Sequence, residues 1–321
     1  MEEEATKVAI NVIGKIVCDH DFTTLTTDNG FLNTMQRSLD RMSNTRTLNP
    51  FHWYNPFSLI HWKYNKYRMD QYLGEVVDEV LFAREQSRQS KTSDTTNINV
   101  AVRAMLKKGN NDAEPMTATT DAQFRKFAVD QLHTLLVAGH DTIASTICYC
   151  YYLLYMNPQA LAKMRHELDE VFGTGVSAAK RLKQSPHLMY LCDYTLVVVK
   201  ETLRLLNPGS VVRRGRKDYF IRDIVSGNMI PTEDLFVWIP SSSINRDPDY
   251  WLQSHSFHPE RFLLDCEDKL TPGAVQPFED EMTNYIGQEL ALTELTIMLA
   301  CTMREFDVRG VYYEPNLRWR G

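Results

Sequence analysis

Residues 138–142, Ala-Gly-His-Asp-Thr, place a glycine and polar side chains inside an otherwise apolar helical stretch. Glycine in a helix interior costs about 1 kcal/mol relative to alanine, and a buried aspartate costs more unless it is paired. Two interpretations are open. Gly139 can mark a close helix crossing with a stray polar neighbour, or Gly139, Asp141 and Thr142 can form a polar site within the helix.

A second group combines opposite charges. Glu201 and Arg204 lie three residues apart, on one face of an expected helix. Exposed pairs of this kind are common and weak, but valines and leucines flank these two residues, which indicates partial burial. Arg261 follows in an aromatic-flanked Pro-Glu-Arg turn. In isolation that turn indicates no particular function.

The elements that must position these residues are mostly helices. Apolar residues recur at helical spacing over about 5–16, 62–87, 120–156, 158–173, 186–206 and 288–304. Short β-prone runs at 211–212, 219–221, 229–230 and 236–239 are separated by turn residues. The polar stretches 91–97 and 109–119 are typical of surface loops. We therefore expect one mainly helical domain over residues 1–321 with a small β-sheet.

Composition narrows the class of protein. The 321 residues are 43% hydrophobic and 24% charged, which excludes disordered, collagen-like and purely coiled-coil chains. The net charge of −6 leaves no electrostatic footprint for nucleic acid, and no polybasic run would hold the chain on an anionic membrane.

The cysteines and the chain start indicate a cellular compartment. Six cysteines without a Cys-x-x-Cys pair favour a reduced, intracellular environment over a disulfide scaffold. The acidic start, Met-Glu-Glu-Glu, is unlike a signal peptide. The longest uncharged stretch, 142–156, is shorter than the roughly 20 apolar residues of a membrane span. We therefore expect no transmembrane segment in this chain.

The motifs described above are individually common, but their order and spacing along the chain form a specific pattern. Ala-Gly-x-Asp-Thr in mid-helix is followed by Glu-x-x-Arg, then by Asn-Arg-Asp-Pro leading into Pro-Glu-Arg-Phe, then by Gly-Gln-Glu-Leu-Ala opening a helix. In this order the chain resembles the C-terminal two-thirds of a fungal-type cytochrome P450, a haem-thiolate monooxygenase, from about residue 3 to 308. The resemblance implies the mainly helical cytochrome P450 fold.

The resemblance also implies roles for the matching residues. Asp141 and Thr142 would be the acid–alcohol pair that delivers protons on the distal side of the haem, and Gly139 would allow a kink beside the oxygen. We expect the side chains of Asp141 and Thr142 to face an apolar cavity rather than solvent. Glu201, Arg204 and Arg261 would form the core network next to the proximal face. Their side chains should converge, because a buried glutamate with two arginines is tolerable only as a fully hydrogen-bonded set. Arg213 would be the cation for a haem propionate. Partners implied by the family are a hydrophobic small-molecule substrate and an NADPH-dependent reductase.

The segment before the last helix departs from the family pattern. Phe278 and Gly287 match, but Tyr285 stands where the family has the cysteine whose thiolate ligates iron, and Thr283 replaces the propionate-binding arginine. The thiolate is what pushes electron density onto iron to favour O–O cleavage. Cys266 and Cys301 lie too far away along the chain to stand in for it.

Tyr285 could in principle ligate haem iron as a tyrosinate. Its phenol has an ordinary pKa of about 10, and the nearby carboxylates of Glu279, Asp280 and Glu281 disfavour ionisation. We therefore expect weak haem binding and an impaired monooxygenase.

Three functions stay open. The first is a monooxygenase of fungal secondary metabolism by ancestry, placed at the endoplasmic reticulum surface for the family and in the cytoplasm for this chain. The second is a haem-free pseudoenzyme that keeps a ligand pocket. The third is a helical interaction protein that uses the former haem cleft. We also expect the chain to be truncated at both ends relative to the family, because a membrane anchor, a haem-clamping helix and a closing hairpin have no counterpart here. The sequence indicates no substrate.

Overall fold

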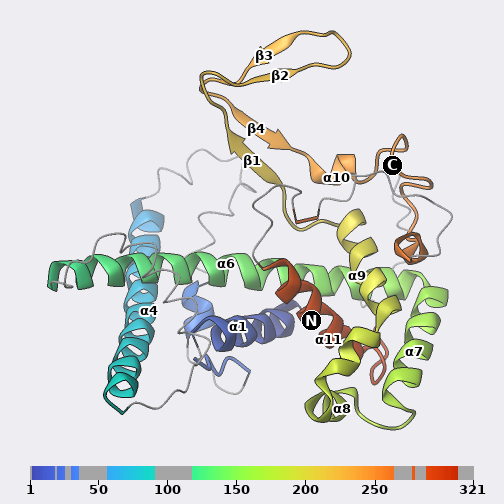
Figure 1. Cartoon of the computed structure of the whole chain (residues 1–321), viewed down its shortest axis with the longest axis horizontal. Coiled ribbons are helices and arrows are strands. Elements are labelled where there is room, and N and C mark those ends of the chain that lie inside the picture. The colour runs from blue at the N-terminus through green and yellow to red at the C-terminus, as the bar shows by residue number, and fades with distance from the viewer. Residues whose placement is uncertain are drawn as a thin grey trace. The chain divides into compact units, whose positions relative to one another are not determined.

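The computed structural model describes residues 2–18, 20–25, 30–35, 56–90, 118–263, 277–278 and 287–309. Contacts group the chain into two compact units, Met1–Ala144 and Ser145–Gly321, with the boundary inside one long helix. The expectation of a single domain over 1–321 stays a prediction. The described residues are mainly helical with short antiparallel strands (Figure 1), so the predicted fold class is confirmed.

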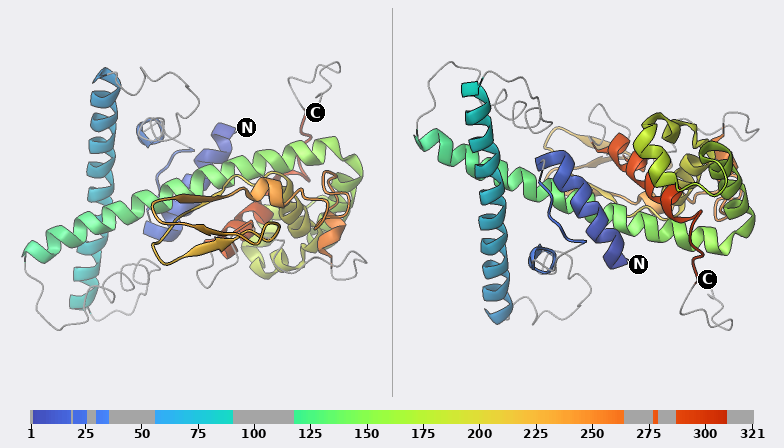
Figure 2. Two further views of the ribbon diagram at one scale, coloured as in Figure 1. Left: turned by 90° about the horizontal axis from the view of Figure 1, so that it is seen from above. Right: turned by 90° about the horizontal axis from the view of Figure 1, so that it is seen from below.

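The first unit is built from α1 (Glu2–Cys18), α4 (Pro56–Ser90) and most of α6 (Ala118–Met156). Three glutamates in the first turn of α1 and Lys15 in its last turn complement the helix dipole. Helix α4 crosses the N-terminal half of α6 (Figures 1 and 2), where Arg125 of α6 forms a bidentate pair with Asp78 of α4 at 2.8 Å.

Aromatic rings fill the core of the first unit. Phe22 and Phe31 stack with their centroids 4.5 Å apart, and Tyr72 of α4 lies 4.7 Å from Phe31. Both phenylalanines are buried, as are Met69 and Leu73 on the adjoining face of α4. Burial of these rings and of the apolar face of α4 is what holds the short segments after α1 in place.

The second unit contains the end of α6 and the helices that follow it. These are α7 (Pro158–Phe172), α8 (Ala178–Gln184), the 3₁₀ helix η2 (Pro186–Leu191), α9 (Asp193–Leu205), α10 (Ser241–Ile244), η3 (Pro259–Phe262) and α11 (Gln288–Thr302). Helices α7, α9 and α11 share a core that includes Met164, Leu168, Val198, Leu295 and Leu299.

The helices differ from those expected in several places. The stretch 186–206 is not one helix, because η2 ends at Leu191 and α9 begins at Asp193, with Cys192 between them. Helix α8 was not expected at all, since its seven residues are too few to display a helical period. The short helices α10 and η3 were not expected either. Helices α1, α6, α7 and α11 agree with the expected ranges to within a few residues, and α4 begins six residues earlier than expected.

The strands form two antiparallel pairs. Strand β1 (Val211–Arg214) pairs with β4 (Phe236–Ile239), with Arg213 opposite Val237, and β2 (Phe220–Arg222) pairs with β3 (Met229–Pro231). A Cβ atom at Gly215 would lie 1.7 Å from the Thr232 carbonyl oxygen. Only glycine therefore permits the close backbone approach at the base of the β2–β3 hairpin.

Candidate functional site

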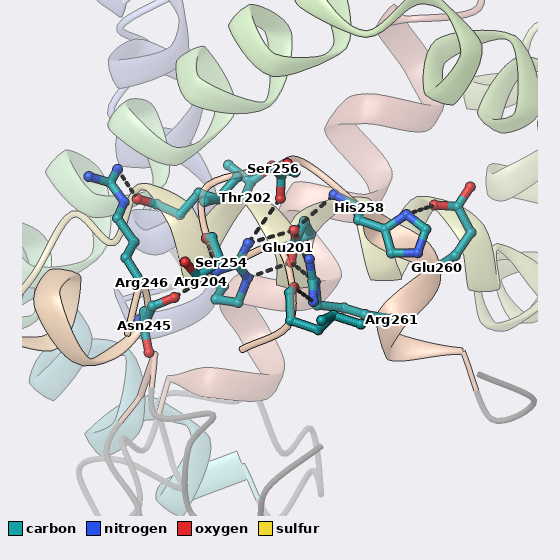
Figure 3. A network of polar contacts seen from close by, with 12 residues as sticks. Glu201, Thr202, Arg204, Asn245, Arg246, Ser254, Ser256, His258, Glu260 and Arg261 are labelled. Atoms are coloured by element: carbon teal, nitrogen blue, oxygen red, sulfur yellow. Dashed lines mark hydrogen bonds and ion pairs between the residues drawn. The ribbon is translucent and has the colours of Figure 1, made fainter. Parts of the chain in front are cut away.

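Glu201 of α9 lies at the centre of a buried charge network (Figure 3). Arg204 donates two parallel hydrogen bonds to it, from Nε to Oε2 and from Nη2 to Oε1, each 2.8 Å long. Arg261 of η3 donates from Nε at 3.2 Å. All three side chains are at most 2% exposed. The three side chains therefore converge as predicted, although sixty residues of sequence separate Glu201 from Arg261.

Backbone groups satisfy most of the remaining donors and acceptors. Arg204 Nη1 donates to the carbonyl oxygens of Asn245 and Ser254 at 2.6 and 2.7 Å, and Nη2 donates to that of Ser256 at 3.1 Å. Arg261 Nη1 donates to the Leu252 carbonyl at 2.9 Å, and the amide of His258 donates to Glu201 Oε1 at 2.9 Å. The network thereby ties the irregular segment 245–258 to helix α9 (Figure 3).

Trp251 is a member of this network that the sequence analysis missed. Its ring lies 4.9 Å from the Arg204 guanidinium carbon and 5.9 Å from that of Arg261, and it is 2% exposed. Two buried guanidiniums face one carboxylate, so the π-face of the indole supplies part of the missing negative potential. The one available signal was the tryptophan two residues after the Asp-Pro-Asp turn, within the segment that leads to Pro-Glu-Arg-Phe.

Gly139 lies in an uninterrupted stretch of α6, where a close helix contact accounts for it. A Cβ atom there would lie 2.4 Å from Ile13 Cδ1 of α1. This contact agrees with the simpler of the two interpretations of the Ala-Gly-His-Asp-Thr segment. No break accompanies the glycine in the helix, and its role beside a bound oxygen stays a prediction.

Asp141 and Thr142 differ in their surroundings. Asp141 is exposed, and Thr142 is half-buried with its hydroxyl donating to the Ala138 carbonyl at 2.8 Å. The expectation that both side chains face an apolar cavity is therefore wrong for Asp141, because the helix turns its carboxylate to the exposed side. The buried polar group of this turn is instead His140, whose Nδ1 lies 2.7 Å from the Leu136 carbonyl oxygen and whose pKa burial lowers.

The other family-implied positions are only partly described. Arg213 is exposed on β1, Phe278 is half-buried in a turn, and Gly287 caps α11 with its carbonyl accepting from the Ala291 amide at 2.8 Å. Tyr285 and Thr283, together with the three carboxylates before them, lie outside the described residues. The assignments to haem for all of these positions stay predictions.

The thiols of the described residues do not fit a haem-thiolate centre. A thiolate ligand needs a cysteine that ionises readily, but burial raises the pKa of Cys150 and of Cys192 to about 12 and also raises that of Cys301. Cys148 is half-buried among tyrosines and apolar residues of α6. The sequence from Phe278 to Gly287 contains no cysteine. Neither the described thiols nor the sequence from Phe278 to Gly287 offers such a thiolate, and Cys266 lies outside the described residues.

Glu294 of α11 is a second residue that the sequence analysis missed. It is 5% exposed, and neither carboxyl oxygen has a hydrogen-bond partner among the described residues. Burial alone raises the pKa of Glu294 to about 8, so this carboxyl is protonated at neutral pH. The sequence signal was a glutamate at a position of α11 otherwise surrounded by Leu, Ala and Thr.

The described residues contain no cluster of three or more His, Cys, Asp or Glu side chains that could hold a metal ion. None of the described helices is long and apolar enough to cross a membrane.

Comparison with known proteins gives a consistent result. The family model described as Cytochrome P450 matches residues 1–313. Cytochrome P450 monooxygenase polC of Polytolypa hystricis is 32% identical over 99% of this chain and 56% of its own length. Cytochrome P450 monooxygenase acrF of Aspergillus aculeatus is 30% identical over 99% of this chain and 65% of its own length. The chain therefore spans 56% and 65% of the length of these two relatives.

Solved structures show the same fold. The crystal structure of a cytochrome P450, CYP102L1, superposes with a TM-score of 0.74 at 20% identity, covering 97% of this chain and 67% of that one. The crystal structure of the cytochrome P450DA heme domain gives a TM-score of 0.73 at 18% identity, over 94% of this chain and 60% of that one.

Proposed function

The chain belongs to the cytochrome P450 family, and from that premise we propose that it derives from a fungal secondary-metabolism monooxygenase that oxidises a hydrophobic small molecule. The fungal monooxygenases it resembles support this proposal, and an NADPH-dependent reductase is the proposed electron donor. The observation that carries it is the buried Glu201–Arg204–Arg261 network, which the sequence builds from two separate motifs of the family.

We further propose that the chain as given is impaired in this activity. The family and its fold imply haem as the cofactor, but the donor set does not fit a haem-thiolate centre. Tyr285 is a phenol flanked by carboxylates in the sequence, and Thr283 carries no positive charge for a propionate. None of the described cysteines lies in the sequence between Phe278 and Gly287, where the family places its ligand.

Other side chains of the chain have proposed roles that do not depend on the missing iron ligand. Glu201, Arg204 and Arg261 hold η3 and the segment before it against α9. Thr142 and Asp141 retain the family-implied role in proton transfer as a proposal, with Asp141 as the group in contact with water. Arg213 retains the proposed role of propionate cation, which its exposed position on β1 leaves accessible.

Haem content tests the proposal directly. The purified chain, expressed with excess haem, is examined for a Soret band, by the pyridine haemochrome assay, and for the spectral shift of the reduced sample with carbon monoxide. We expect sub-stoichiometric haem and no thiolate-type shift. A stoichiometric haem complex with a thiolate-type carbon monoxide spectrum would refute the proposed impairment.

Two variants test whether the missing thiolate ligand and the missing cation cause the weak haem binding that we expect. Tyr285→Cys with Thr283→Arg restores the ligand and the cation, and we expect it to raise haem content and to give a thiolate-type carbon monoxide spectrum. Tyr285→Phe is the matched control, because it removes the phenol hydroxyl without adding a thiol. Loss of haem in Tyr285→Phe would show that tyrosinate is the ligand and would contradict the impairment proposal in its present form.

A second candidate function is that of a haem-free protein that binds a ligand or a partner in the former haem cleft. The lack of a suitable thiolate donor favours it. Haem content discriminates it from the monooxygenase, and binding of hydrophobic small molecules to the haem-free chain separates a ligand-binding protein from an interaction protein. The family is usually associated with the endoplasmic reticulum, and for this chain we propose an intracellular, cytoplasmic location.

A further inference from the structure

Strand β4 is an apolar edge strand. Among the described residues β1 is the one strand that pairs with it, and both strand pairs extend away from α9 and α11 (Figure 1). The side chains of Phe236 and Trp238 are 76% and 62% exposed. Natural edge strands usually carry a charge, a proline or a bulge that prevents pairing with other chains. The run 235–239, which consists of β4 and the leucine before it, has none of these features.

The backbone groups of Phe236 and Trp238 point away from β1. The Gly215 amide donates to the Leu235 carbonyl oxygen at 2.9 Å, and the register of β1 with β4 continues this pairing to Val237. In an antiparallel ladder such hydrogen-bonded residues alternate with residues whose N–H and C=O groups point to the opposite side. Phe236 and Trp238 therefore offer two donors and two acceptors at the side of β4 away from β1, which we call the free edge.

Strand β1 has a different edge. Arg213 and Arg214 are two of its four residues, and both are exposed. Charged side chains at an edge oppose pairing with another strand, because pairing would desolvate them or bring like charges together. The free edge of β4 is therefore the side of this sheet where a further strand can pair.

We propose that the free edge of β4 pairs with β4 of a second copy of this chain, which gives a symmetric dimer with a four-stranded sheet. A two-fold axis between antiparallel neighbours is perpendicular to the sheet and passes midway between one residue and its own copy. With Val237 at the axis, Phe236 lies opposite Trp238 of the second copy, and the reverse pair follows by symmetry. These are the residues with outward backbone groups, so symmetry and hydrogen bonding select the same register. With Trp238 at the axis, Phe236 would meet Pro240, which has no N–H to donate.

The same register keeps like charges apart. Opposite residues of an antiparallel pair lie on one face, so Arg214 of β1 lies in the same row as Phe236. That row across the dimer continues with Trp238 and Val212 of the second copy, and the symmetric row has the reverse order. The two copies of Arg214 are thus three strand spacings, or about 14 Å, apart, which exceeds the Debye length of about 8 Å at physiological ionic strength. Each row also places a phenylalanine ring against a tryptophan ring, which is a favourable cross-strand pair.

The size of the contact predicts a weak dimer. At their observed exposure, the rings of Phe236 and Trp238 in each copy leave about 300 Å² of surface to bury. Pairing adds the backbone edge of a four-residue strand, and the total stays below the roughly 800 Å² per partner of a standard interface. We therefore expect reversible association in the micromolar range. The dimer does not depend on haem binding or on monooxygenase activity, so it can be tested on the chain as purified.

Sedimentation equilibrium of the parent chain tests the proposal. Between about 1 and 200 µM, the average mass should rise from that of one chain toward that of two chains and should not exceed it. An isologous contact closes on itself, so it leaves no free edge for a third copy. This measurement does not rely on the folding of a variant. A monomer over the whole range, or growth beyond the dimer, would overturn the proposal.

A cysteine at the two-fold axis tests the register. In Val237→Cys the two new thiols come from directly opposite residues whose Cα atoms are about 4.5 Å apart, a separation that a disulfide can span. Mild oxidation should therefore give a covalent dimer on a non-reducing gel. Val212→Cys is the matched control, because Val212 is 53% exposed on β1 and its two copies lie at opposite ends of the dimer sheet. The parent chain, oxidised in the same way, gives the background of its own cysteines. Equal cross-linking of the two variants would contradict the proposed register.

Trp238→Lys places a charge on the free edge and removes both ring pairs of the dimer. We expect the dissociation constant of the dimer to rise by about ten-fold or more. Phe220→Lys is its control, since Phe220 is 47% exposed on β2, outside the β1–β4 pair, and it should associate as the parent does. Circular dichroism checks that each variant is folded. Equal losses in the two variants would assign the association to another surface. A parent that stays monomeric but binds an extended apolar peptide, with that binding lost in Trp238→Lys, would assign the free edge to a foreign strand; either result would overturn the proposal.

Discussion

Two buried carboxylates of the second unit, on α9 and on α11, have opposite surroundings. Glu201 is fully buried and accepts hydrogen bonds from two guanidiniums and a backbone amide. Glu294 is almost as deeply buried, and neither of its oxygens has a partner among the described residues. Burial of a carboxylate is unfavourable in both cases, but at Glu201 specific donors stabilise the charge, whereas at Glu294 the group is neutralised instead.

The two buried carboxyl groups therefore affect the stability of the fold in different ways. At Glu201 the carboxylate fixes the position of η3 and of the backbone from Asn245 to His258. At Glu294 the carboxyl holds a proton that it would lose in water at neutral pH. The first should therefore support the fold at neutral pH, and the second should weaken the fold as the pH rises.

The largest effect is expected for Glu201→Ala. Removing the carboxylate leaves Arg204 and Arg261 as uncompensated buried cations, so the free energy of unfolding should fall by about 3–5 kcal/mol. Chemical denaturation of parent and variant measures it. Glu170→Ala is the matched control, because Glu170 pairs with His166 on an exposed stretch of α7 and its loss should change stability little. A Glu201→Ala variant that melts like the parent would contradict the role assigned to the network.

Trp251→Leu should destabilise the chain by about 3 kcal/mol, because it removes both buried area and the π-face next to two guanidiniums. Trp251→Phe keeps an aromatic face and should lose only about 1 kcal/mol. The difference between the two variants, measured by denaturant unfolding, reports the contribution of the ring face. If leucine and phenylalanine were equally destabilising, packing alone would explain the tryptophan.

Glu294→Gln should stabilise the chain at neutral pH by about 3 kcal/mol. The pKa of Glu294 in the folded chain is about 8, raised from 4.5. Its proton is therefore retained on folding, so stability is full below pH 4.5 and falls as the pH rises through about 8, by about 1.4 kcal/mol per pH unit. The variant should remove this slope and match the parent near pH 4. Denaturant unfolding between these limits checks it, and an unchanged slope would rule out an unpaired carboxyl.

The smallest effect is expected for Lys163→Met. Lys163 pairs with Glu260, but its side chain is 58% exposed, and the Tyr194 hydroxyl still donates to Glu260 at 2.8 Å without it. The loss should stay below about 1 kcal/mol and should diminish further at high salt. A loss as large as that of Glu201→Ala would mean that exposure does not distinguish the two charge clusters.

The sequence alone predicted the class of fold and the members of the charge network. Helical periodicity is a local property, so the long helices α4, α6, α7 and α11 agree with the expected ranges apart from their ends. Glu201, Arg204 and Arg261 were grouped through the order of the family motifs that contain them, and their pairing was expected because a buried glutamate with two arginines must be hydrogen-bonded. The absence of a cysteine between Phe278 and Gly287 was identified by comparison with the same family pattern.

Tertiary structure decided which face each residue occupies. Asp141 is exposed although an apolar helix surrounds it in sequence, and Gly139 is explained by Ile13 of another helix. Trp251 joins the arginines, and the carboxyl oxygens of Glu294 are buried, only because distant segments pack around them. Burial of Met69 and Leu73 fixes the rotation of α4 and leaves Phe57, Ile60 and Tyr64 exposed. Local sequence sets the period of a helix, whereas the neighbours that pack against it set which side meets the solvent.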